Sequence, residues 1–501
     1  MNFVCSLPLF MIVASLFSGV LCLLLKKRAA YTVCMTLLGL LAIADVIVLA
    51  YTMGHGAFTY KMGEFPAPWG NEIRAGVLEC LVLLVFLIVM LCSIPAGYRY
   101  LRWEVDETKH NLYCALFNLA SAAVCALVFT NDIFTGYVFL EILTLASCGL
   151  MVATETGRIV LAGVRYMIMN LLGSSLFLLG VVLLYGITGH LLMVPLHESL
   201  SEICVDPSMM LTVTLVIGVI TIGLAIKSGL FPFYFWMPDT YGWSTPSTAS
   251  FMSSVVSKAY IFLLIKVYWR VIGFELMDQM PIHLVLLILG IAGVIIGSIS
   301  AIRTNDVNRM VAYSSAAQIG YIFMSMGIGG TAGYTAAIFH LLGHSVTKSL
   351  LFLVTPRLEE VSHDSMIFKD LHGSGLRDRF SGFLFTACAL SMTGIPLFAG
   401  FASKFLIVMA SWQSGSRSLF VVIALALAVS TVLNALYFLR TVIRIYSHPE
   451  DEDLSEGRPV QRRHTLGYVI PAWVLIGVNV FLGLFPAIAC GLIGSGFGML
   501  M

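Results

Sequence analysis

The chain is a succession of long apolar stretches separated by short polar segments. Each apolar stretch is close to 20 residues long, the length at which an α-helix crosses the hydrocarbon core of a bilayer. The pattern predicts an all-α, polytopic membrane protein with about 14 transmembrane helices. The predicted spans are 3–25, 31–53, 76–97, 112–129, 133–153, 161–187, 210–236, 248–269, 282–302, 310–328, 332–355, 380–411, 419–443 and 468–490.

The polar loops carry an uneven share of positive charge. Alternate loops hold 17 Lys and Arg residues, whereas the loops between them hold 4. Because Lys and Arg are enriched in cytoplasmic loops, this imbalance favours an even number of spans with both termini on the non-cytoplasmic side. We therefore expect a multi-pass protein of the cell (inner or plasma) membrane.

Composition supports the same class. Apolar residues make up 59% of the chain and charged residues 11%, and the mean hydropathy is +0.94. Soluble proteins carry about 25% charged residues. The eleven cysteines are scattered singly, without a C-x-x-C pair, so we expect no iron–sulfur or zinc site in this chain. We expect a lipid bilayer around the protein and no nucleic-acid partner.

The most informative stretch is 221–260, where one apolar helix is interrupted and another begins. Lys227 lies at the end of the first helix, Gly229 and Pro232 interrupt it, and Lys258 lies in the second. Gly and Pro can break a membrane helix only where the freed backbone is buried in protein or lines a wet cavity. An ionisable residue inside a span is itself a functional-site hypothesis. Both signals coincide here.

A similar interruption occurs in the twelfth predicted span. Gly394 and Pro396 break the helix, and Lys404 follows. The two broken helices, the seventh and twelfth, lie five spans apart, which is typical of internal repeats with binding elements near the membrane midplane. Lys227 precedes its proline, whereas Lys404 follows its own. This reversed order favours inverted repeats.

A third cluster lies in the eleventh span, where His340, His344 and Lys348 are four residues apart. This spacing keeps the three side chains on one face of a helix. The two histidines could bind a metal or a haem, but no carboxylate or cysteine in the same span completes a metal set. Neutral His and Lys could instead pass protons along a wetted face. Alternatively, the three side chains have only a structural role and make hydrogen bonds to a neighbouring helix.

Seven basic residues fall within predicted spans. Three lie near span ends, where long side chains can reach the interface: Arg165, Lys266 and Arg440. The other four are central: Lys227, Lys258, Lys348 and Lys404. Glu141 in the fifth span is their acidic counterpart. Five central charges cost roughly 12–17 kcal/mol on an insertion scale of about 2.5–3.5 kcal/mol each, so a structural role would require all of them to be paired or hydrated.

Several motifs occur together, and in order, over about residues 110–410. They are 139–141 with Leu145, KSGLFPFYFWMPD (227–239), Lys258, RMVAYSSAAQIGY (309–321), FHLLGHSVTKSLLF (339–352) and GIPLFAGFASKF (394–405). In this combination the sequence resembles the antiporter-like membrane subunits shared by respiratory complex I, Mrp-type cation/proton antiporters and membrane-bound energy-converting hydrogenases. Its length and Lys404 are most similar to the D subunit of the Mrp antiporters.

The resemblance implies a domain plan and a role for each central residue. The expected domains are helices 1–3 (1–110), two inverted five-helix repeats comprising helices 4–8 (111–275) and 9–13 (276–447), and a cytoplasmic loop with helix 14 (448–501). The expected path begins at a Glu141–Lys227 charge pair, continues along a polar axis and reaches an outer half-channel at Lys404. The axis residues are Lys258, His340, His344 and Lys348. Two positions depart from the family pattern: Tyr234 stands where its members usually have His, and Thr245 where they have Ala before Pro246.

The implied function is proton translocation by one subunit of a multi-subunit ion-pumping complex, with H⁺ either moved alone or exchanged for Na⁺ or K⁺. The implied partners are other membrane subunits, and the chain needs no cofactor, metal or catalytic centre of its own. Whether the complex is an enzyme stays open, since redox energy drives pumping in hydrogenases and NADH-quinone oxidoreductases. A stand-alone solute transporter and a quinone- or haem-binding subunit are further alternatives.

Overall fold

The computed structural model describes residues 3–65, 70–362, 365, 367–447 and 464–500. The loop predicted at 448–463 lies outside the described residues. The first half contains α1 (Phe3–Leu24), α2 (Lys27–His55), β1 (Phe58–Lys61), η1 (Met62–Glu64), β2 (Glu72–Ala75), α3 (Val77–Glu104), η2 (Glu107–Lys109), α4 (His110–Phe129), α5 (Ile133–Val152), α6 (Gly157–Thr188), α7 (Met193–Ile203), α8 (Pro207–Ser228), η3 (Phe233–Trp236), α9 (Met237–Trp243), α10 (Pro246–Phe251), η4 (Met252–Val256), α11 (Ser257–Lys266), η5 (Val267–Ile272) and α12 (Phe274–Met277). The second half contains α13 (Ile282–Arg303), α14 (Val307–Met326), α15 (Gly330–Glu360), η6 (Phe368–Leu371), α16 (Ser374–Arg377), α17 (Arg379–Thr393), α18 (Ala399–Gln413), α19 (Arg417–Tyr446), α20 (Leu466–Leu484) and α21 (Pro486–Leu500).

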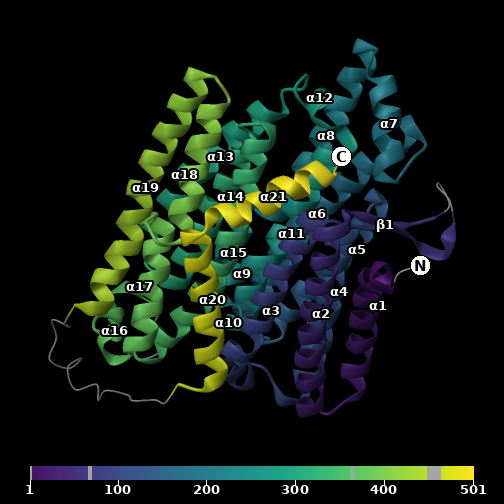
Figure 1. Ribbon diagram of the computed structural model, residues 1–501. Coiled ribbons are helices and arrows are strands. Elements are labelled where there is room, and N and C mark those ends of the chain that lie inside the picture. Colours follow the sequence, from purple (N-terminus) through teal and green to yellow (C-terminus); the bar gives the residue numbers. More distant parts are fainter. Residues whose placement is uncertain (1–2, 66–69, 363–364, 366, 448–463, 501) are drawn as a thin grey trace.

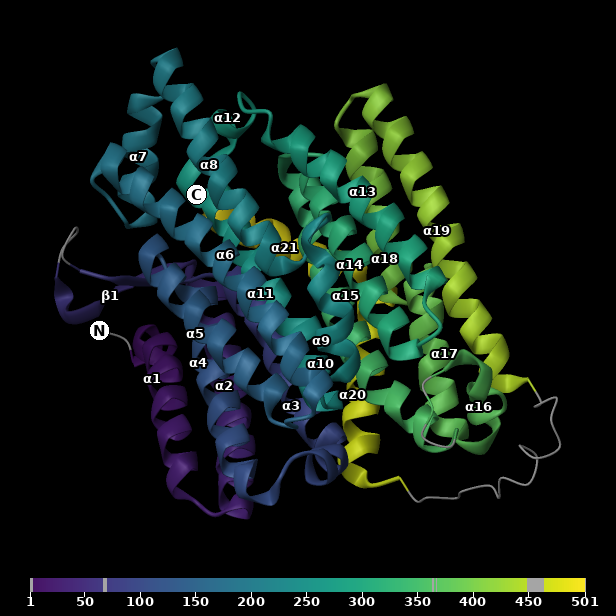
Figure 2. The ribbon, with the colours of Figure 1, turned by 180° about the vertical axis from the view of Figure 1, so that it is seen from behind.

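The long helices stand side by side in one bundle, which confirms the predicted all-α membrane class (Figures 1 and 2). Within the described residues, 12 helical segments are long and apolar enough to cross a membrane. Two predicted spans, 310–328 and 380–411, correspond to α14 and to the interrupted pair α17–α18, which are outside that set. The count of 14 and the repeat symmetry therefore stay predictions.

Both predicted helix breaks are present. α8 ends at Ser228 and α17 at Thr393, and the next residue in each case is a glycine in the left-handed region, with φ of +78° at Gly229 and +93° at Gly394. Left-handed backbone is easy for glycine and strained for other residues, so it ends a helix cleanly. The proline that follows each glycine lies in the connecting turn, where its missing N–H leaves no helical bond unmade.

Two features of the backbone differ from the predicted spans. The eighth span winds as a π-helix over η4, just before Lys258, and again over η5. The fourteenth span ends at Leu484, and α21 then runs across the bundle (Figure 1). Pro486 explains this second difference, because proline disfavours the helical conformation of the residue before it but is well suited to begin a new helix.

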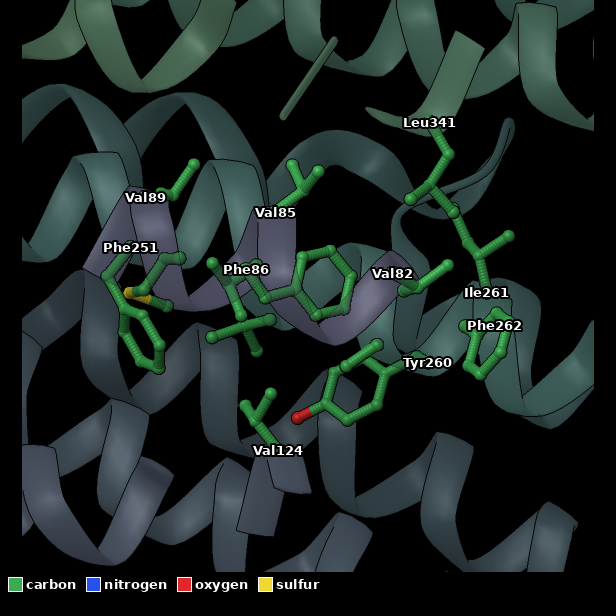
Figure 3. Close-up of a cluster of buried hydrophobic side chains, with 14 of the residues drawn as sticks. Val82, Val85, Phe86, Val89, Val124, Phe251, Tyr260, Ile261, Phe262 and Leu341 are labelled. Atoms are coloured by element: carbon green, nitrogen blue, oxygen red, sulfur yellow. The ribbon is translucent and has the colours of Figure 1, made fainter. Parts of the chain in front are cut away.

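The span that carries Lys258 and the span that carries His340, His344 and Lys348 are the most completely enclosed. All residues from 245 to 272 and from 336 to 358 are buried. Apolar side chains of α3, including Val82 and Phe86, pack against Ile261 and Phe262 of α11 and Leu341 of α15 (Figure 3). Side chains with polar groups therefore occupy the middle of the bundle, and exposed apolar side chains of α1, α2, α6 and α19 face outward, as a membrane-embedded protein requires.

The three basic residues predicted to reach the interface behave differently from one another. Arg165 is half-exposed and pairs with Asp239 at 2.7 Å, and Arg440 is exposed. Lys266, by contrast, is wholly buried and donates to the carbonyl oxygen of Val128 at 2.8 Å and to that of Thr130. The prediction that Lys266 reaches the interface is wrong, because the end of α4 supplies acceptors within the bundle.

Replacing Gly229 by alanine should destabilise the protein. A Cβ atom at this position would lie 2.4 Å from Met237 Sδ, and the backbone φ of +78° is strained for alanine. We expect the free energy of unfolding to fall by roughly 1–2 kcal/mol, measured as a lower thermal midpoint in detergent. Gly218→Ala is the matched control, since Gly218 lies in α8, the helix that Gly229 ends, and its Cβ would meet nothing within 4 Å. Equal midpoints for the two variants would contradict the assigned role of Gly229.

Candidate functional site

Lys227 and Glu141 form an ion pair inside the first half of the bundle. The Lys227 Nζ atom lies 3.4 Å from Glu141 Oε1 and donates a hydrogen bond of 2.7 Å to Thr144 Oγ1. The lysine side chain is 0% exposed and the glutamate side chain 23% exposed. Lys227 Nζ also lies 5.2 Å from the centre of the Tyr260 ring, whose hydroxyl is 3.0 Å from Thr144 Oγ1. Glu141 and Lys227 are therefore in direct contact as predicted, and the Thr144 hydroxyl and the Tyr260 ring also contact the lysine.

Two glycines allow α6 and α8 to enclose the stem of Lys227. A Cβ atom on Gly173 would lie 2.8 Å from the carbonyl oxygen of Gly223 and 3.0 Å from Lys227 Cγ. A Cβ atom on Gly223 would lie 2.7 Å from the carbonyl oxygen of Gly173. Small residues at such positions let membrane helices approach closely, and here the approach excludes lipid from the lysine.

Lys258 has no carboxylate partner among the described residues. Its Nζ atom donates to the carbonyl oxygen of Ser253 and lies 3.4 Å from Ser257 Oγ. Ser253 belongs to the π-helical segment η4, whose wider winding alters the regular pattern of backbone hydrogen bonds. The side chain of Lys258 is 0% exposed, so its ammonium group depends on backbone and hydroxyl oxygens of its own helix.

His340, His344 and Lys404 line one small cavity. Its volume is about 10 Å³, which is room for about one water molecule. His340 Nδ1 lies 3.0 Å from Ser403 Oγ, but His340 Nε2 and both ring nitrogens of His344 have no hydrogen-bond partner among the described residues. Buried polar atoms of this kind are normally satisfied by ordered water. The cavity therefore joins the histidines of α15 to the lysine of α18.

Lys404 folds back over the broken end of α17. Its Nζ atom donates to the carbonyl oxygen of Thr393 at 2.8 Å and to Thr431 Oγ1 at 3.2 Å, and it would lie 3.2 Å from a Cβ on Gly394. The last carbonyl groups of a helix lack intrahelical partners and carry the negative end of its dipole. A cation placed there is stabilised without a carboxylate.

Lys348 completes the set and is wholly buried. Its Nζ atom donates to the carbonyl oxygen of Val311 at 2.8 Å and to Ser314 Oγ, both on α14. Lys258 lies within electrostatic range of Lys348, His340 and His344. The structure thus brings the second-half residues together around Lys258. It gives no direct contact between Lys227 and Lys258 among the described residues.

Several polar residues that complete this site were absent from the sequence prediction. Thr144 and Tyr260 hold Lys227, Ser253 accepts from Lys258, and Ser403 contacts His340. Two of them could have been found, because Thr144 lies one turn after Glu141 and Ser253 lies in the serine-rich stretch before Lys258. Among the described residues, no three His, Cys, Asp or Glu side chains are placed to hold a metal ion.

The sequence of this chain is similar to that of several known membrane proteins. The family described as NADH:quinone oxidoreductase/Mrp antiporter, TM, matches residues 130–432. The N subunit of the NADH-quinone oxidoreductase of Desulforudis audaxviator (strain MP104C) is 33% identical over 499 residues, 96% of each chain. The D subunit of the Na(+)/H(+) antiporter of Bacillus subtilis (strain 168) is 26% identical over 431 residues, 86% of this chain and 83% of that one.

A solved structure shares the fold over the whole length. A chain in the structure of the Mrp complex from Dietzia sp. DQ12-45-1b matches with a TM-score of 0.86 and 25% sequence identity, covering 100% of this chain and 98% of that one. The resemblance predicted from the motifs is confirmed by these matches.

Thr144→Val should destabilise the protein by removing the hydroxyl that accepts from Lys227 and hydrogen-bonds with Tyr260. The substitution keeps the shape of the side chain but leaves a buried ammonium group with one hydrogen bond fewer, which costs about 1–3 kcal/mol. We expect a lower thermal midpoint in detergent. Thr212→Val is the control, because Thr212 is exposed on α8 and donates only to the carbonyl oxygen of Ser208. A midpoint unchanged from wild type would show that Thr144 does not support Lys227.

Proposed function

This chain belongs to the NADH:quinone oxidoreductase/Mrp antiporter transmembrane family, and we propose that it moves protons across the bilayer along its central row of ionisable side chains. It is an antiporter-like ion-pumping subunit and a multi-pass membrane protein. The row of residues proposed to carry the protons consists of Glu141, Lys227, Lys258, His340, His344, Lys348 and Lys404.

The observation that carries the proposal is the environment of Lys227. A wholly buried ammonium group lies 3.4 Å from one carboxylate oxygen and 2.7 Å from one hydroxyl, at a helix break. Glu141 stabilises the charged lysine, so separating the pair weakens the hold on the proton. A charge or movement in a neighbouring subunit that shifts Glu141 would therefore release a proton towards the centre of the bundle.

The geometry of the second half supports a continuation of this route. Lys258 lies within electrostatic range of both histidines, and these line a water-sized cavity with Lys404. Unpartnered imidazole nitrogens can accept and donate protons through an ordered water. Lys404 is partly exposed, and in this proposal it is the residue from which the proton leaves. The step from Lys227 to Lys258 requires intervening water or movement of side chains near Tyr260.

Two kinds of complex remain as candidates, and they differ in the source of energy that drives transport. The match to the D subunit of an Na(+)/H(+) antiporter supports exchange of H⁺ for Na⁺ or K⁺, driven by an ion gradient. The match to the N subunit of an NADH-quinone oxidoreductase, over 96% of both chains, supports a redox-driven complex. In either case other membrane subunits are the partners. The subunits that co-purify with the chain, and the dependence of transport on Na⁺, distinguish the two.

The matches to bacterial antiporter subunits and the charge of the loops support a proposal for the membrane and the orientation of the chain. We place it in the plasma membrane with both termini on the non-cytoplasmic side, since alternate loops hold 17 basic residues against 4. The helix breaks at Gly229, Pro232, Gly394 and Pro396 lie in two five-helix repeats, 111–275 and 276–447, in this proposal. Cysteine labelling of each loop from one side of the membrane tests the orientation.

Lys227→Arg should abolish proton transport even though it keeps the positive charge. Arginine stays protonated at every accessible pH, so it cannot release the proton that transport requires. We expect transport by the reconstituted complex to fall by about 100-fold or more, as it should for Lys227→Ala. Lys369→Arg, at an exposed position of the short helix η6, is the matched control and should transport normally. Normal transport by a fully assembled Lys227→Arg complex would show that Lys227 acts only as a fixed positive charge and does not carry a proton.

Glu141 and Lys227 should behave as one unit in a double-mutant cycle on transport rate. Glu141→Gln removes the carboxylate and strands a buried ammonium group, which costs about 3–5 kcal/mol unless the group loses its charge. We expect each single variant to lose most of its activity and the double variant, Glu141→Gln with Lys227→Ala, to be little worse than either. Losses that simply multiply would show that the two residues act independently, and Glu141 would then not be the working partner of Lys227.

A further inference from the structure

The break in the twelfth predicted span is held together by a side chain from another helix, Asn479 of α20. Asn479 is 1% exposed. Its Oδ1 atom accepts a hydrogen bond of 3.3 Å from the backbone N–H of Ala399, the first residue of α18, and lies 3.2 Å from the hydroxyl oxygen of Ser391, near the end of α17. A single amide group therefore contacts both sides of the break.

The nitrogen of the same amide reaches a third helix. Asn479 Nδ2 donates to Thr347 Oγ1 of α15 at 2.5 Å, and the Thr347 hydroxyl donates to the carbonyl oxygen of Gly343 at 2.7 Å. A hydroxyl has one hydrogen to donate, so Thr347 must accept from Asn479, whereas the N–H of Ala399 can only donate. The position therefore requires one donor and one acceptor, which asparagine supplies.

The bond to Ala399 satisfies a group that α18 itself leaves unpaired. The first N–H groups of a helix have no intrahelical partner. Phe398, at the N-cap position of α18, makes no side-chain cap hydrogen bond. The Asn479 carbonyl group thus takes the place of a cap, from a helix 80 positions further along the chain. Its loss would leave a buried N–H group without an acceptor.

Close packing of α20 keeps this contact in place. α20 packs against α15, α17 and α18 (Figures 1 and 2). A Cβ atom on Gly483, one turn after Asn479, would lie 2.3 Å from the carbonyl oxygen of Leu397 in the connecting turn. Leu397 has a φ of +96°, a conformation that is uncommon for residues other than glycine and persists where the surrounding structure enforces it. The helix break therefore depends on contacts with α20.

The residues that Asn479 contacts also form the surroundings of Lys404. Lys404 Nζ donates to the carbonyl oxygens of Met392 at 3.4 Å and Thr393 at 2.8 Å, the two residues that follow Ser391. The water-sized cavity beside Lys404 is lined by all three residues that bond to Asn479, namely Thr347, Ser391 and Ala399. Asn479 is not among the lining residues, so it acts on Lys404 through these neighbours.

We propose that Asn479 is a positioning residue that fixes the broken twelfth span around Lys404. The inference rests on the proposed function, and it extends the last site of the row to a helix outside residues 130–432, the range that the family model matches. The carbonyl groups of Met392 and Thr393 can hold the ammonium group only where α17 ends, and Asn479 holds that end against α15 and α18. Without Asn479, the acceptors of Lys404 and the cavity no longer keep a fixed spacing.

Asn479→Leu should change the pH dependence of proton transport by the reconstituted complex. Leucine has a similar volume but neither donates nor accepts, so the acceptors of Lys404 are held less firmly and a higher proton concentration is needed to load the lysine. We expect the pH of half-maximal transport on the alkaline side to fall by roughly 0.5–1, with a maximal rate at lower pH within about twofold of wild type. Among the described residues, the titratable groups that face Lys404 are His340 and His344 of α15 and Tyr321 of α14, and all remain in this variant.

Asn118→Leu is the matched control and should keep the wild-type pH profile. Asn118 is also wholly buried, but it lies in α4 and donates to Cys22 Sγ of α1 at 3.4 Å. Thr347→Val is a second test variant, in case Asn479→Leu fails to fold. It keeps the shape of the side chain but removes the acceptor on α15, so it should shift the profile in the same direction by a smaller amount.

Hydrogen exchange of residues 390–405, measured by mass spectrometry, reports on the break without any transport measurement. We expect exchange there to be at least about tenfold faster in Asn479→Leu than in wild type or Asn118→Leu. Faster exchange with an unchanged pH profile would overturn the positioning role and leave a structural one. Wild-type exchange and a wild-type profile in both Asn479→Leu and Thr347→Val would overturn it as well. Normal transport by Lys404→Ala would instead overturn the role of Lys404 in the proposed function, on which the exchange measurement does not depend.

Discussion

An ammonium group in the middle of a membrane protein must find its acceptors inside the protein, and much of this structure depends on that constraint. Lys227, Lys258 and Lys348 are each 0% exposed. Only Lys227 has a carboxylate within ion-pair distance among the described residues, and the others rely on carbonyl and hydroxyl oxygens. Most carbonyl groups inside a regular helix already accept one intrahelical bond, so Lys258 uses a carbonyl oxygen of an irregular segment and Lys348 adds a second hydrogen bond to a carbonyl oxygen of the neighbouring α14.

The irregular segments therefore have a common physical role. The π-helical segment before Lys258 contains its carbonyl acceptor, and the broken end of α17 provides that of Lys404. In lipid an unsatisfied carbonyl group would be strongly unfavourable, which explains why these irregularities lie inside the bundle. The same constraint orders the helices in space: the spans of Lys258 and Lys348 are enclosed, and many apolar side chains of the outer helices are exposed.

The two halves stabilise their buried cations differently. Lys227 has a carboxylate partner 3.4 Å away, and in the proposed mechanism separation of this pair weakens the hold on the proton. Lys404 is stabilised by helix-end carbonyl groups that cannot leave, and it lies beside a water-sized cavity with two histidines. In the proposed function, the paired lysine is the site of proton uptake and Lys404 is the site of release.

Sequence alone determined the membrane class, the two helix breaks and the central ionisable residues, because each depends on local chemistry: span length, backbone freedom at Gly229 and Gly394, and charge within apolar stretches. Tertiary structure alone decided which oxygen meets which lysine. Lys266 bonds to a carbonyl group 138 positions away, and Trp269 packs on Phe497. The crossing direction of α21 and the bonds of Asn479 to both sides of the second helix break likewise arise from packing between distant segments. The hydropathy of the sequence shows which charges lie in apolar spans, but only the packing of the helices determines which oxygen atoms stabilise them.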